Sequence, residues 1–162
     1  MKSGIARVVA LVMLTLVVGC GGPKEPEEQI RVSMVTMGDP AQRDIVITPD
    51  LDGATVEIWE YKEALDPTMP KKRDAKPIPP TKTSKIPKAD YAGLWKAFPK
   101  GHIWNLADIK GGGGGTTTAA IYTVELRHSG RHVKATLEGA EQAADKSGWQ
   151  IIEPVLKVAG VK

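Results

Sequence analysis

The turn signal Ser129-Gly130 lies between two segments in which apolar and polar side chains alternate, 119–128 and 131–137. Alternation is the period of a half-buried strand, and a two-residue loop that contains glycine is typical of a tight hairpin. We therefore predict an antiparallel β-hairpin that turns at these two residues. We expect its apolar face to be buried between the sheet and helices.

The position of the turn also fixes the register of this hairpin. One face is then apolar, with the cross-strand pairs Leu126–Val133, Val124–Ala135 and Tyr122–Leu137. The other face has the pairs Arg127–His132, Glu125–Lys134 and Thr123–Thr136, of which the opposite charges and the two threonines are favourable neighbours. A shift of one residue would exchange the two faces. We therefore expect Leu126 to be buried, Glu125 and Lys134 to face water, and His128 and His132 to lie on opposite faces.

Three further stretches have the composition of strands, and two have the spacing of helices. The strand candidates are 30–36, 44–48 and 55–61, of which the last two form a second hairpin around the turn 49–53. Apolar residues at helical spacing predict helices at 90–98 and 149–159. Because of Pro154, the second helix must start late or kink. The predicted fold is a single small α+β domain over 30–162, an antiparallel sheet with two short helices packed on one face.

Two stretches of this domain have the composition of loops. Residues 62–88 are rich in proline and lysine, and prolines at this density exclude helices and the interior of sheets. We therefore predict an extended loop of polyproline character over the whole of 62–88. Residues 111–118 are five glycines and three threonines, and they predict a flexible connector. They lack the Gly-Lys-Ser/Thr ending of a phosphate-binding loop.

The amino terminus has the order of a secretory signal peptide. Lys2 and Arg7 precede an apolar run from Val8 to Val18, and small residues follow at Gly19-Cys20. A helix that spans a bilayer needs about 20 apolar residues, and this run is shorter. The motif Val17-Val18-Gly19-Cys20 resembles the lipobox of bacterial lipoproteins.

This resemblance implies cleavage before Cys20 and attachment of diacylglycerol to its sulfur, often with a further acyl chain on the new amino terminus. Residues 1–19 would then be a lipoprotein signal peptide, and 20–29, rich in Gly, Pro and Glu, a flexible tether. The lipid would hold the domain at the cell membrane or outer membrane, on the periplasmic or extracellular side. In many Gram-negative bacteria an aspartate after the lipidated cysteine marks inner-membrane retention, so Gly21 implies sorting to the outer membrane.

Composition argues against several functions. The net charge of +3 falls to about +1 when Lys2 and Arg7 leave with the signal peptide, and nucleic-acid-binding proteins are usually far more basic. Cys20 is the only cysteine, so with lipid attached it leaves no disulfide or thiolate metal ligand. The three histidines, among them His102, do not form the converging set of three or four ligands that zinc needs. We predict no nucleic-acid partner, no metal, no cofactor and no catalytic residues.

The remaining candidates are contact residues. We expect most of the four tryptophans in the core, with Trp59 and Trp104 as candidates for ligand or partner contact. The basic residues Lys71, Lys72 and Arg73 could bind an envelope protein or an anionic polymer. The predicted function is a lipid-anchored, non-catalytic binding or assembly-support domain. The alternatives are an envelope enzyme with a site of dispersed Asp and Glu residues and His102, and a glycan-binding module that uses an exposed tryptophan.

Overall fold

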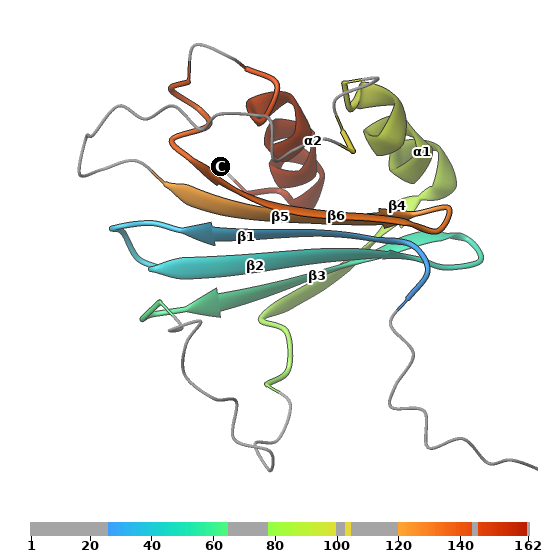
Figure 1. Ribbon diagram of the computed structural model, residues 1–162. Helices are drawn as coiled ribbons and strands as arrows, with labels where there is room; N and C mark the ends of the chain where they lie inside the picture. The colour runs from blue at the N-terminus through green and yellow to red at the C-terminus, as the bar shows by residue number, and fades with distance from the viewer. Residues whose placement is uncertain (1–25, 65–77, 100–102, 105–119, 144–145, 162) are drawn as a thin grey trace, which may run out of the picture.

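Six strands form one sheet in which every pair of neighbours is antiparallel (Figure 1). This computed structural model describes residues 26–64, 78–99, 103–104, 120–143 and 146–161. The order across the sheet is β4-β3-β2-β1-β5-β6. The strands are β1 (Gln29–Val35), β2 (Gln42–Pro49), β3 (Gly53–Tyr61), β4 (Lys82–Pro87), β5 (Ile121–His128) and β6 (Arg131–Glu138). The α+β fold predicted from the sequence is confirmed.

The terminal hairpin has the predicted register. Leu126 is opposite Val133, Glu125 is opposite Lys134, and His128 is opposite Arg131 next to the turn. Ser129 and Gly130 both have positive φ, 51° and 74°, as the twist of a two-residue hairpin requires. The second predicted hairpin, β2 and β3, is also present. β1 lies between the two hairpins and joins them into a single sheet.

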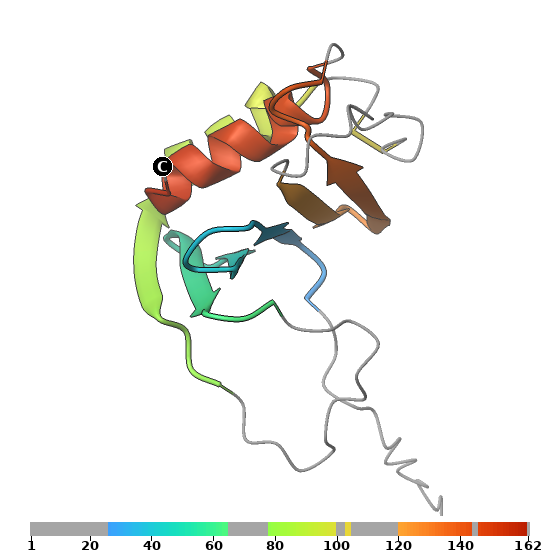
Figure 2. The ribbon, with the colours of Figure 1, turned by 90° about the vertical axis from the view of Figure 1, so that its left-hand side faces the viewer.

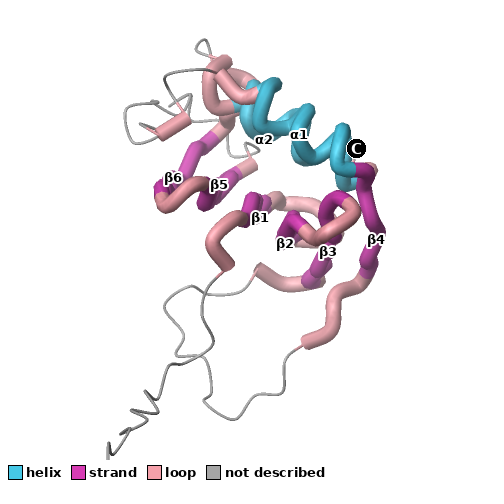
Figure 3. Tube along the Cα trace, turned by 90° about the vertical axis from the view of Figure 1, so that its right-hand side faces the viewer, coloured by secondary structure: helices cyan, strands magenta, loops and turns pink. Residues whose placement is uncertain are grey.

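Helices α1 (Lys88–Ala97) and α2 (Trp149–Ala159) both cover the same side of the sheet (Figures 2 and 3). The largest fully buried side chains lie between these two layers and are Ile30, Ile45, Ile47, Leu126, Leu137, Ile151 and Ile152, with Val32, Val56, Val124 and Val155. The stripes predicted for the helices supply buried residues, such as Leu94 and Phe98 in and just after α1 and Ile152 and Ala159 in α2. Burial of these stripes fixes both helices on the apolar face of the sheet. Pro154 lies inside α2, which begins at Trp149.

The prediction of a loop over the whole of 62–88 is wrong at its carboxyl end. Residues 82–87 form strand β4, which pairs with β3, and α1 begins at Lys88, before the expected start. β4 is an edge strand, where lysines remain in water and a proline, which has no N–H to donate, is tolerated at the last position. The prolines at 67, 70 and 77 lie outside the described residues, so the prediction is untested there.

Candidate functional site

Only two of the six candidate site residues lie within the described part of the chain. Cys20, the basic residues 71–73 and also His102 fall outside it, as do the Gly-rich residues 111–118. Trp59 and Trp104 are described, and both are half-buried. Trp104 packs on Trp95 of α1, whereas Trp59 is on the side of the sheet away from the helices, so the two rings do not form one surface for a ligand.

Trp104 belongs to an aromatic cluster on the helix side of the sheet. Its ring stacks on that of Trp95 from α1, with the centroids 6.4 Å apart and the planes 20° apart. Trp95 also stacks on His128 at 4.4 Å, and the guanidinium carbon of Arg131 lies 5.8 Å from the Trp104 centroid. Trp149 packs edge-on to Tyr122, at 6.0 Å. Three of the four tryptophans thus pack against the core, as expected, although each keeps some exposure.

Trp59 lies on the side of the sheet opposite the two helices, which we call the open face. No helix or strand among the described residues covers this side. The indole Nε1 of Trp59 donates a hydrogen bond to the carbonyl oxygen of Ile78, at 2.9 Å. Trp59 is directly opposite Asp44 on β2, so a half-buried aromatic ring adjoins a carboxylate.

Asp44 is the centre of a polar network on the open face. Its side chain accepts hydrogen bonds from Ser33 Oγ at 2.6 Å, from Gln42 Nε2 at 3.0 Å and from Arg31 Nη2 at 3.2 Å. Only 5% of Asp44 and 7% of Gln42 are exposed. A buried carboxylate is tolerated because a guanidinium and two neutral donors replace its hydration. The network is therefore a preformed element of this surface.

A second charged group on the open face is centred on Glu125. One oxygen, Oε1, accepts hydrogen bonds from Arg127 Nη2 at 2.7 Å and from Arg127 Nε at 3.1 Å, and His132 Nε2 lies 3.1 Å away. Lys134 is exposed and lies opposite Glu125, as predicted, but the water-facing position predicted for Glu125 is wrong, because only 14% of its side chain is exposed and it bonds to Arg127 and His132. Burial alone raises the pKa of Glu125, but Arg127 and His132 together outweigh it and lower the pKa below its usual value.

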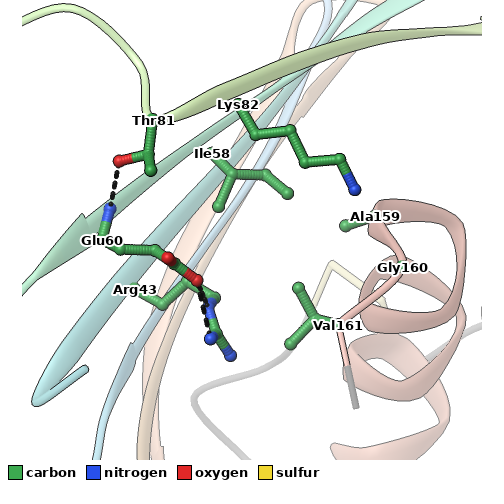
Figure 4. A pocket seen from close by; sticks show the side chains of 8 residues that line it. All are labelled: Arg43, Ile58, Glu60, Thr81, Lys82, Ala159, Gly160 and Val161. Atoms are coloured by element: carbon green, nitrogen blue, oxygen red, sulfur yellow. Dashed lines mark hydrogen bonds and ion pairs between the residues drawn. The ribbon is translucent and has the colours of Figure 1, made fainter. Parts of the chain in front are cut away.

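On the helix side, a cleft of about 610 Å³ lies between the β3–β4 edge of the sheet and the end of α2 (Figure 4). Arg43 and Glu60 form its floor, with 2.7 Å between Nη2 and Oε1. Thr81 Oγ1 accepts a hydrogen bond from the backbone N–H of Glu60, at 3.1 Å. Lys82 extends over the cleft toward Gly160, the left-handed residue that ends α2.

The polar groups of this cleft already have roles in the fold. The Arg43–Glu60 ion pair neutralises itself, and the Lys82 ammonium lies near the carboxyl end of α2, where a cation is favourable. The backbone N–H groups of Gly160 and Val161 bond to the last carbonyls of the helix. Among the described residues that line the cleft, Glu60 is the only carboxylate, it is paired with Arg43, and none is a histidine.

The described carboxylates do not assemble a reactive centre. Asp44 and Glu60 each bind an arginine, but they lie on opposite faces of the sheet. No group of three or more Asp, Glu, His or Cys side chains within the described ranges could hold a metal ion. The register of β2 and β3 explains this separation. Asp44 is opposite Trp59, and Glu60 is the next residue after Trp59, so its side chain points to the other side of the sheet.

The sequence pattern alone does not reveal either charged group of the open face. The only signal in the sequence for the group around Asp44 is alternation, which puts its members on the polar sides of β1 and β2: Arg31, Ser33, Gln42 and Asp44. This alternation does not predict the group, because the sequence does not show that β1 pairs with β2. The predicted register correctly places Arg127, Glu125 and His132 on one face, but their pairing depends on side-chain conformations.

Comparisons with known proteins give no identification. No protein-family model matches this chain, and no curated protein matches it. No helix in the described ranges has the length and apolar character needed to cross a bilayer.

Proposed function

We propose that this chain is a lipid-anchored envelope protein whose α+β domain binds another envelope protein through the open face. The observation that carries the proposal is the preformed polar surface around Trp59, which no described helix or strand covers. Preformed polar networks and half-buried aromatics at fixed positions are what protein interfaces use for orientation and affinity.

The charge of the open face favours a protein partner over an anionic polymer. Its basic residues are Arg31, Lys85, Arg127 and Lys134, and its acidic residues are Asp44, Glu57, Glu125 and Glu138. Equal numbers of opposite charges give little net attraction for a polyanion. Mixed charges instead allow a matched arrangement on a second protein, which provides specificity.

The alternatives have less support. An enzyme that uses the dispersed acids would need carboxylates that converge, whereas Asp44 and Glu60 are on opposite faces. A glycan-binding module would need a tryptophan platform, whereas Trp104 packs in the aromatic cluster and Trp59 stands apart from it.

Photocrosslinking tests the open face directly. A photoreactive amino acid at Glu57, which lies on the open face midway along β3, should give one discrete adduct with another envelope protein. Glu153, an exposed residue of α2, is the matched control on the other side of the domain and should give no such adduct. Equal adducts at both positions, or none at Glu57, would contradict the proposal.

The lipid anchor is tested at Cys20. The wild-type chain should incorporate labelled fatty acid. Cys20→Ser should incorporate none and should retain its signal peptide, because the lipid is attached to the cysteine sulfur. Intact mass spectrometry and fatty-acid labelling measure both effects. An unmodified cysteine in a wild-type chain that still begins at Met1 would rule out the lipoprotein assignment.

A further inference from the structure

β6 is an edge strand of the sheet, and no helix or strand among the described residues pairs with its outer side. The other edge, β4, has only six residues and ends in Pro87, and a short length and a proline are common protections against pairing with another chain. β6 has eight residues and no proline, and five of its side chains are exposed. An edge strand of this kind presents a row of backbone donors and acceptors that another strand can take up.

The direction of the free backbone groups follows from the hairpin. The N–H of Gly139, directly after β6, donates to the carbonyl oxygen of Ala120 at 2.9 Å, so odd-numbered residues of this strand point their backbone groups toward β5. In an antiparallel ladder these groups alternate in direction. The even-numbered residues 132–138 therefore direct their N–H and C=O groups outward, away from the sheet.

The side chains on this edge are complementary to a copy of themselves. Lys134 and Glu138 are exposed, face the same side, and have no ion-pair partner within the described ranges. Thr136 lies midway between them. If two β6 strands pair antiparallel about a two-fold axis at Thr136, each Lys134 faces a Glu138 of the other copy, and the two threonines face each other.

We propose that β6 is a self-association edge, through which two copies of this chain join their sheets antiparallel with Thr136 at the two-fold axis. Three features of the pairing are favourable: outward backbone groups meet, opposite charges are directly across the strands, and a Thr–Thr pair occupies the centre. On the helix side, the half-buried Ala135 faces Leu137 of the second copy. The inference is independent of the partner proposed for the open face, which stays accessible in such a dimer.

Cysteine crosslinking tests the centre of the interface. Cells that express the full chain with Thr136→Cys should give a disulfide-linked dimer of twice the chain mass under mild oxidation. Thr123→Cys is the matched control, because Thr123 is directly opposite Thr136 on the same face but on the interior strand β5. The wild-type chain controls for Cys20. A lack of this dimer, an equal yield from Thr123→Cys, or a crosslink only to a protein of another mass would overturn the proposal.

Charge reversal is a second measurement that does not depend on the cysteine variant. In the full chain, a zero-length carbodiimide should link Lys134 to Glu138 of the other copy. Lys134→Glu or Glu138→Lys alone should abolish this crosslink, because the reagent joins an amine to a carboxylate and each variant leaves two like groups opposite each other, which also repel. The double variant Lys134→Glu with Glu138→Lys restores the opposite charges and should restore the dimer. No loss in the single variants, or no recovery in the double variant, would refute the arrangement.

Discussion

Leu126→Ala should lower the free energy of unfolding by about 2–5 kcal/mol, the range for removal of a fully buried leucine side chain. Leu126 is 0% exposed, and its strand neighbours on this face are Ile30 of β1 and Val133 of β6. It therefore contributes to the core where β1 joins the terminal hairpin. Urea unfolding followed by tryptophan fluorescence measures the change.

Leu51→Ala is the matched control for this substitution. Leu51 is 97% exposed in the turn between β2 and β3, so the same truncation should change the free energy of unfolding by less than about 0.5 kcal/mol. Similar values for the two variants would show that the apolar face of the hairpin is not in the core, and that the register around Ser129-Gly130 is wrong.

Gly53→Ala should destabilise the domain by about 3 kcal/mol, at the upper end of the range for overpacking. A Cβ atom at this position would overlap the carbonyl oxygen of Ile86 and would lie 3.0 Å from the backbone nitrogen of Lys88. Both are backbone atoms, so neither can rotate away as a flexible side chain could. The added methyl group would push β4 and the start of α1 away from β3.

Gly93→Ala supplies the contrast for Gly53. Gly93 lies inside α1, and a Cβ there would meet no atom within 4 Å. Because alanine favours the helix, this change should raise the free energy of unfolding by up to about 1 kcal/mol. The same urea titration compares the two glycines. If Gly53→Ala were as stable as wild type, the close passage of the β4–α1 connection over β3 would be incorrect.

The open face shows how far the candidate site could be predicted. Trp59 could be singled out because it shares a strand face with Thr55 and Glu57, against the apolar side of the same strand. The sequence does not predict that Asp44 lies beside Trp59, because the two residues are adjacent only through the β2–β3 register. The limited exposure of Glu125 has a different reason, since the predicted register is correct but its bonds to Arg127 and His132 depend on how neighbouring side chains pack.

The sequence by itself determined the parts of the fold that depend on near neighbours along the chain. The turn at Ser129-Gly130 and the alternation around it specified a hairpin register, and the spacing of Leu94 and Phe98 or of Ile152 and Ala159 specified the buried side of each helix. These features are local, because strand and helix periodicity place side chains on a face without reference to the rest of the molecule.

Only the tertiary structure decided which elements become neighbours. Alternation in β1 shows which of its side chains are buried, but not that it pairs with both β2 and β5 and so brings Arg31 to Asp44. β4 illustrates the same limit, since a short strand with lysines and a proline is stable only because β3 supplies its hydrogen bonds. Contacts between distant segments are set by the burial of the whole apolar face, and a local pattern does not contain that information.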